Sequence, residues 1–187
     1  MRAQLKRFIE AMDENSIAII PAAHEAVRSY DTEYKFRQDS DFWYLTGFPE
    51  PDAIAVIDPR AKKPYTLYVR PRDPLMETWF GRRQGVEGAV KNYGADKAVS
   101  IDKFEADLGK LLDGHDKLYY RFALDSALDQ KILHYLSNQR QRRLKSAYPP
   151  HTIVDPTIII RDMRLHKNTK EIEQMQTAAS IPTEAHI

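Results

Sequence analysis

The chain has 187 residues, a net charge of +1 and 29% charged residues, so it is long enough for one domain with its own hydrophobic core, or for one domain plus a fragment. It contains no cysteine, which excludes thiolate zinc sites, a catalytic cysteine and a disulfide framework. The balanced charge gives no general attraction to nucleic acid or to a membrane surface.

The N-terminal segment shows no sign of export or membrane insertion. Charged residues interrupt positions 1–10 throughout, so the apolar core of a secretory signal is missing. The longest uncharged apolar run, residues 17–23, contains Pro21 and is too short to span a membrane. We therefore expect a cytoplasmic globular protein that contacts neither membrane nor nucleic acid.

The first half of the chain predicts a helix followed by strands. Leu5, Phe8, Ile9 and Met12 follow the spacing of an amphipathic helix over residues 2–13. Apolar runs predict a buried strand at 17–20 and a strand at 53–57, and the β-prone run 65–69 forms a plausible hairpin with the latter. The polar residues 24–35 are interpreted as a connection, and residues 73–95 as a proline-started turn followed by a short glycine-bounded helix.

The second half alternates helices with strands. Asp102 and Glu105 resemble a capping box for a helix over 102–113. The elements expected after it are a strand at 117–122, a helix at 125–138, a strand at 152–154 and a helix at 155–164. A last helix begins with a second capping box, Asn168 with Glu171, and the chain stops before that helix shows a C-terminal signal. This alternation predicts an α/β fold.

Residues 36–48 concentrate aromatic side chains. Asp39 or Ser40 can cap a short helix there, and Gly47 can end it in a left-handed conformation. Phe42, Trp43 and Leu45 are expected to point into a core, with Arg37 and Asp41 paired at its edge. The stretch is therefore interpreted as structural packing.

No catalytic or metal site emerges from the residue pattern. The histidines are widely separated and lack the spacing of a zinc-peptidase helix, and His134 is expected on a solvated helix surface. Asp39 and Asp41 are more typical of capping and ion pairing than of a shared cation. The basic run Arg140, Arg142, Arg143 and Lys145 is interpreted as a solvated surface, not a nucleic-acid site.

The segment Trp79-Phe80-Gly81-Arg82-Arg83 combines aromatic side chains with positive charge. Packing within the domain is favoured for this segment. A contact with a partner or substrate stays open as the alternative, because aromatic and arginine side chains recur in binding hot spots.

The run Arg37-Gln38-Asp39-Ser40-Asp41-Phe42-Trp43-Tyr44-Leu45-Thr46-Gly47-Phe48 with Glu50-Pro51 resembles a signature of the Xaa-Pro aminopeptidase (aminopeptidase P) N-terminal domain. Residues 22–34, the block from Arg72 to Arg83 and the block from Met163 to Ile172 are similar to neighbouring family segments in the same order. The resemblance covers essentially the whole chain.

This resemblance implies a creatinase- and prolidase-like domain, a mixed β-sheet flanked by helices, over residues 1–162. Residues 163–187 would be the linker and the start of the first helix of a C-terminal pita-bread catalytic domain. In the family that domain holds two divalent metal ions, commonly manganese, and cleaves the bond before proline. No catalytic or metal-binding residue carries over to this chain, so we expect it to be inactive alone.

The resemblance also implies a role for the chain's surface. Trp79, with Arg82 and Arg83 as weaker candidates, would lie at the rim of the substrate cleft, and the full enzyme would be a homodimer or homotetramer acting on proline-containing peptides. Three alternatives stay open: a stand-alone pseudoenzyme module that binds proteins, the N-domain of a prolidase or creatinase, and a nuclease-like domain that uses Asp39 and Asp41.

Overall fold

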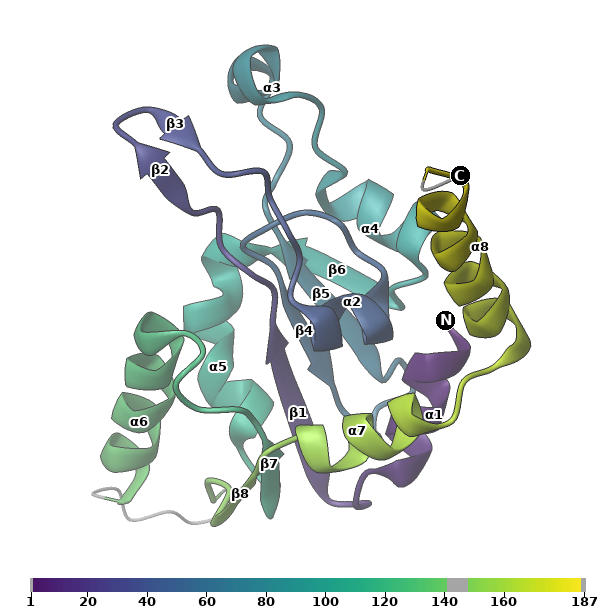
Figure 1. The fold of residues 1–187 in the computed structure, drawn as a ribbon. Helices are drawn as coiled ribbons and strands as arrows, with labels where there is room; N and C mark the ends of the chain where they lie inside the picture. Colours follow the sequence, from purple (N-terminus) through teal and green to yellow (C-terminus); the bar gives the residue numbers. More distant parts are fainter. Residues whose placement is uncertain (1, 141–147, 186–187) are drawn as a thin grey trace.

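The central layer of the protein is a six-stranded sheet, seen in a computed structural model that describes residues 2–140 and 148–185 (Figure 1). Its strands lie in the order β6-β5-β4-β1-β7-β8. They are β1 (Ser16–Pro21), β4 (Ile54–Ile57), β5 (Tyr65–Val69), β6 (Lys97–Ser100), β7 (Lys117–Tyr119) and β8 (Thr152–Val154). Strand β4 is antiparallel to both neighbours, whereas the other pairings are parallel. The expected mixed sheet is therefore confirmed, including the β4–β5 hairpin.

Helices cover both faces of this sheet. One face packs against α1 (Ala3–Ala11), α2 (Ser40–Thr46), α4 (Gly85–Tyr93) and α7 (Thr157–Leu165), and the other against α5 (Phe104–Leu112) and α6 (Ser126–Arg140). Strand β1 supplies both cores, because successive side chains of a strand point to opposite faces. Ala18 and Ile20 enter the first core, while Ile17 and Ile19 enter the second.

Three elements extend away from the two cores. Strands β2 (Val27–Ser29) and β3 (Thr32–Glu33) form a separate hairpin, and α3 (Pro74–Phe80) stands apart from the sheet. Helix α8 (Thr169–Ala185) follows α7 and has no buried residue. Its capping box is confirmed: Glu171 N donates to Asn168 Oδ1 at 3.0 Å, and Asn168 N donates to Glu171 Oε2 at 2.9 Å.

Several expectations about local structure were wrong. The connection expected at 24–35 contains the β2–β3 hairpin, strand β6 was not anticipated, and the strand expected at 117–122 ends at Tyr119. The capping box at Asp102 does not form. A 3-10 turn (Ile101–Lys103) precedes α5, Asp102 accepts a hydrogen bond from Ser100 Oγ, and Glu105 pairs with Lys131.

The basic run at 140–145 lies outside the described residues, apart from the backbone at 140. Within the described part of the chain, no helix has the length and apolar character needed to cross a membrane.

Candidate functional site

Helix α2 forms as its sequence predicts. Asp39 Oδ1 accepts hydrogen bonds from Asp41 N at 3.0 Å and Phe42 N at 2.8 Å, and Gly47 ends the helix with φ 64°. Phe42 and Leu45 are fully buried, as expected, but Trp43 is 46% exposed. The expectation for Trp43 was wrong because neighbouring helix positions point about 100° apart, so Trp43 turns outward when Phe42 turns inward.

Asp41 holds α7 against α2. Its carboxylate lies 2.6 Å from Arg164 Nη1 and 4.0 Å from Arg121 Nη1, so it pairs with residues far along the chain and not with Arg37 as expected. The carboxylate of Asp39 is occupied with helix capping. Neither side chain is therefore arranged to share a cation, and no group of three or more His, Asp or Glu that could hold a metal occurs among the described residues.

Gln38 is a connecting residue that the sequence did not reveal. Its Oε1 accepts hydrogen bonds from Ala23 N at 2.8 Å and Asp39 N at 2.9 Å. Its Nε2 donates to the carbonyls of Phe48 at 3.2 Å and Glu50 at 2.9 Å. All four partners are main-chain groups, so nothing in the side-chain pattern pointed to them.

We call the β2–β3 hairpin and α3 the two arms. The β2–β3 hairpin follows β1, and α3 follows β5. Strands β1 and β5 are parallel to each other, since each is antiparallel to β4, so both arms leave the sheet at the same end (Figure 1). The arms and their flanks expose large apolar side chains: Val27 65%, Tyr30 98%, Tyr34 60%, Leu75 73%, Trp79 79% and Phe80 66%. Exposed apolar area on this scale is typical of contact surfaces.

Polar contacts fix the conformation of α3. Asp73 Oδ1 accepts from the N–H groups of Leu75 and Met76 at 3.0 and 3.3 Å. The carboxylate of Glu77 accepts hydrogen bonds from Arg72 Nε at 2.8 Å and Arg72 Nη2 at 2.7 Å, and this pairing lowers the pKa of Glu77 to about 2. The helix thus holds its shape through its polar side, while its apolar side chains are left in solvent.

The structure places the three predicted rim residues on and directly after α3. Trp79 lies in its last turn, Arg82 is exposed, and Arg83 is partly buried with its N–H 3.3 Å from Glu77 Oε1. Packing within the domain, favoured for Trp79 and Phe80 from the sequence, was wrong: both side chains are mostly exposed. The segment therefore presents two aromatic side chains and Arg82 to solvent.

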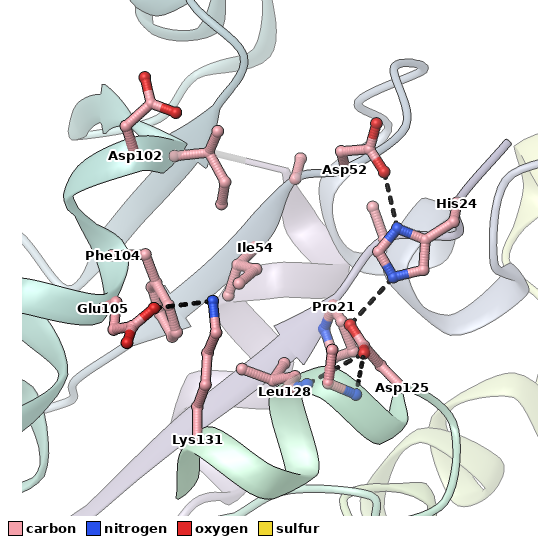
Figure 2. Close-up of a pocket in the computed structure, with 14 residues that line it drawn as sticks. Pro21, His24, Asp52, Ile54, Asp102, Phe104, Glu105, Asp125, Leu128 and Lys131 are labelled. Carbon is pink, nitrogen blue, oxygen red and sulfur yellow. Dashed lines mark hydrogen bonds and ion pairs between the residues drawn. The ribbon is translucent and has the colours of Figure 1, made fainter.

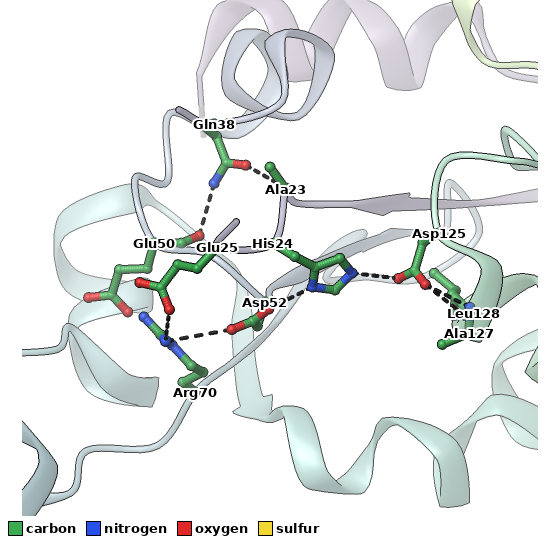
Figure 3. A network of polar contacts seen from close by, with 10 residues as sticks. All are labelled: Ala23, His24, Glu25, Gln38, Glu50, Asp52, Arg70, Asp125, Ala127 and Leu128. Atoms are coloured by element: carbon green, nitrogen blue, oxygen red, sulfur yellow. Dashed lines mark hydrogen bonds and ion pairs between the residues drawn. The ribbon is translucent and has the colours of Figure 1, made fainter. Parts of the chain in front are cut away.

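A polar network joins the bases of the arms (Figure 3). Arg70, which follows β5, lies 3.4 Å from Glu25 and 3.5 Å from Asp52 through Nη1. Glu50 Oε1 accepts from Gln84 N at 2.5 Å, and burial raises the pKa of the Glu50 carboxyl. Charged side chains from separate connections therefore meet beneath both arms.

Comparison with known proteins gives a consistent result. Residues 1–119 match the family model "Aminopeptidase P, N-terminal domain". The chain is 36% identical to the Xaa-Pro aminopeptidase of Escherichia coli over 95% of its own length and 41% of that protein. It is 32% identical to human Xaa-Pro aminopeptidase 3 over 85% of its length and 32% of that protein.

Solved structures agree with the sequence matches. The Pseudomonas aeruginosa aminopeptidase PepP superposes with a TM-score of 0.92 at 38% identity, covering 98% of this chain and 42% of that one. A zinc-substituted E. coli aminopeptidase P in complex with product gives 0.91 at 34% identity, covering 98% and 42%. The chain thus spans about two fifths of the length of the bacterial proteins it matches. It belongs to the aminopeptidase P N-terminal domain family.

Proposed function

We propose that this chain is the non-catalytic N-terminal domain of a metal-dependent Xaa-Pro aminopeptidase, which removes the residue that precedes proline at a peptide N-terminus. The observation that carries the proposal is the coverage. Nearly all of this chain matches the N-terminal region of proteins named Xaa-Pro aminopeptidase, which extend well beyond it. The absence of cysteine agrees with a cytoplasmic location.

In this proposal the metal site lies in the catalytic domain and not in residues 1–187. Two divalent ions, with manganese the expected species, would supply a hydroxide and polarise the scissile carbonyl. The described residues do not fit such a pair, because they contain no cluster of His, Asp or Glu suited to a metal. The role of this chain is therefore to bind and to shape, and we expect it to be inactive alone.

The exposed helix α8 supports a division of the chain. Ile172, Met175 and Ile181 expose 45%, 58% and 64% of their surface, although apolar residues on a helix ordinarily face a core. We assign residues 1–162 to the N-terminal domain and 163–187 to the linker and first helix of the catalytic domain, whose core would cover these side chains.

The arms supply the proposed contact with substrate and with a second subunit. Trp79 presents most of its ring to solvent on a helix whose shape is fixed by Asp73 and Glu77. An aromatic side chain held in this way is suited to the rim of a peptide cleft, with Arg82 and Arg83 adding positive charge. A homodimer or homotetramer would cover the remaining apolar area of the arms.

The activity test compares two proteins. The protein encoded by the whole gene should release the first residue from Xaa-Pro peptides with Mn²⁺ present, whereas residues 1–187 alone should release none. Manganese-dependent turnover that copurifies with residues 1–187 would overturn the assignment. A gene that stops at codon 187 would favour a protein-binding module instead.

Trp79 has its own test in the whole enzyme. Trp79→Ala should lower kcat/KM for Xaa-Pro peptides by about tenfold or more, because a contact aromatic contributes about 2 kcal/mol. Leu133→Ala is the matched control, since Leu133 is 52% exposed on the distant helix α6. Equal kcat/KM values for the two variants would show that Trp79 does not contact the substrate.

A further inference from the structure

His24 lies between two carboxylates that come from different parts of the chain (Figure 2). Its Nδ1 is 2.6 Å from Asp52 Oδ1, and its Nε2 is 2.9 Å from Asp125 Oδ2. Asp52 belongs to the connection between α2 and β4, and Asp125 precedes α6. The ring therefore links the segment that leaves β1 to two other connections.

The geometry sets the charge of the ring. A carboxylate only accepts hydrogen bonds, and a neutral imidazole carries a single N–H, so a neutral ring can satisfy one of the two carboxylates. Both contacts form only when His24 is protonated. The carboxylates lie at opposite edges of the ring, so they do not converge on a position that a metal ion could share (Figure 2).

The surroundings favour the protonated form. The hydrogen bond with Asp52 raises the pKa of His24; desolvation opposes this, and the contact with Asp125 adds to it. Burial opposes ionisation of Asp125, but the Leu128 N–H, the His24 ring and the Ala127 N–H together lower the pKa of its carboxyl.

Other charged groups near His24 are already paired. Arg70 lies 3.5 Å from Asp52 and 3.4 Å from Glu25. Across the adjoining pocket of about 460 Å³, Lys131 pairs with Glu105 at 3.0 Å and Asp102 accepts from Ser100. The His24 side chain is 57% exposed, so protons reach it from solvent without any opening of the fold.

This network lies at the base of both arms. His24 and Glu25 lie just before β2, and Arg70 lies a few residues before α3. The residues of β2 and β3 are all exposed, so the hairpin adds no side chain to either core cluster. The contacts of His24 and Glu25, together with the hydrogen bond from Ala23 N to Gln38 Oε1, therefore hold the base of the hairpin against the body of the domain.

We propose that His24 is a proton-dependent clasp that sets the position of the β2–β3 arm. When the ring is protonated, it holds both Asp52 and Asp125 and ties the arm to the start of α6. When the ring loses its proton, one carboxylate is released and the base of the arm loosens. Because folding raises the pKa of His24, the clasp is complete at pH values below the ordinary histidine range and is lost as the pH rises through the raised value.

Amide hydrogen exchange on residues 1–187 tests the clasp without any assay of catalysis. The reporter is the Tyr34 N–H, which donates to the Ala26 carbonyl at 2.9 Å across the hairpin. Its protection, expressed relative to the intrinsic exchange rate at each pH, should fall about fivefold between pH 5.5 and pH 8.5 in the unaltered chain. His24→Gln should show the lower protection at both pH values.

His134→Gln is the matched control, because His134 is an exposed imidazole hydrogen-bonded to Asn138 within α6. It should behave like the unaltered chain. An NMR titration gives the second readout: the His24 ring should titrate above the ordinary histidine pKa of about 6.5, and Asp125→Asn should lower that value. Protection that does not change with pH, unchanged protection in His24→Gln, or a His24 pKa at or below the ordinary value would each overturn the proposal. The outcome is independent of whether the whole protein cleaves Xaa-Pro peptides.

Discussion

The side-chain amide of Gln38 binds the main chain at the other end of the aromatic stretch 36–48: Gln38 Nε2 donates a hydrogen bond to the carbonyl of Phe48 at 3.2 Å. The same amide binds three further main-chain groups, at Ala23, Asp39 and Glu50. One side chain therefore fixes the exit from β1, the start of α2 and the connection that follows α2. This relationship explains how the signature stretch keeps its shape although its two flanks are irregular.

Removing the Gln38 amide should destabilise the domain. Gln38→Ala leaves four main-chain groups without this partner, and we expect the free energy of unfolding to fall by about 2–4 kcal/mol. Gln130→Ala is the control, because Gln130 is exposed on α6 and its loss should change stability by about 0.5 kcal/mol or less. Urea unfolding measures both. Equal losses of unfolding free energy in Gln38→Ala and Gln130→Ala would contradict the role given to Gln38.

The neighbouring aromatic residues Phe42 and Trp43 should respond differently to truncation. Phe42→Ala should cost about 3–5 kcal/mol, because its ring is fully buried. Trp43→Ala should cost about 1–2 kcal/mol, because nearly half of that side chain is already in water. If Phe42→Ala fails to fold, the comparison is made with Phe42→Leu and Trp43→Leu. A larger loss for Trp43 would show that its ring is covered in the isolated chain.

Two glycine substitutions should act in opposite directions. Gly47 has φ +64°, a left-handed conformation that residues with a Cβ rarely adopt, and a Cβ there would also displace the flexible end of Arg2. Gly47→Ala should therefore lower the free energy of unfolding by about 1–2 kcal/mol, mainly through backbone strain. Gly109 is inside α5, where a Cβ would be 3.4 Å from the Tyr135 ring. Gly109→Ala should therefore raise stability by up to about 1 kcal/mol through helix propensity. Thermal unfolding of both variants tests the contrast, and a gain for Gly47→Ala would refute it.

Acid should weaken a contact between β7 and the connection that joins α1 to β1. Asp13 accepts from Lys117 Nζ and Tyr119 Oη, both at 2.5 Å, and these bonds, Lys117 first, lower the pKa of Asp13. A carboxyl whose pKa is lowered by folding stabilises the protein above its unfolded-state pKa and ceases to do so as the pH falls through the folded-state value.

Asp13→Asn should therefore have a lower free energy of unfolding than the unaltered chain at pH 7, and the difference between the two free energies should narrow between pH 4 and pH 2. Urea unfolding across that range measures it. Glu14→Gln, one position along and also exposed, provides the control. A gap for Asp13→Asn that stays constant with pH would show that the carboxylate charge does not matter there.

The sequence predicted the fold well where one physical signal dominated. Apolar runs located β1 and β4, a β-prone run located β5, and Asp39 with Gly47 delimited α2. The β2–β3 hairpin was missed because its residues are exposed and lack an apolar alternation. The side chain of Asp102 was misassigned because Ser100, two positions away, competes for it.

The candidate site was predictable in its residue types but not in its connections. The sequence singled out Trp79, but only the structure shows that its ring is largely in solvent. The partners of His24 lie 28 and 101 residues away, so spacing gave no clue to them. Such contacts depend on which connections the sheet order brings together.

The position of β1 in the sheet matters during synthesis. Its two edges are covered by β4 and β7, and β7 is made about 100 residues after β1 itself. A nascent chain that ends after α5 therefore has one side of the fully buried strand β1, Ser16–Pro21, without its hydrogen-bonding partner. An open edge of this kind is a template for pairing with other chains. That edge is closed only when Lys117–Tyr119 has been made and pairs with β1.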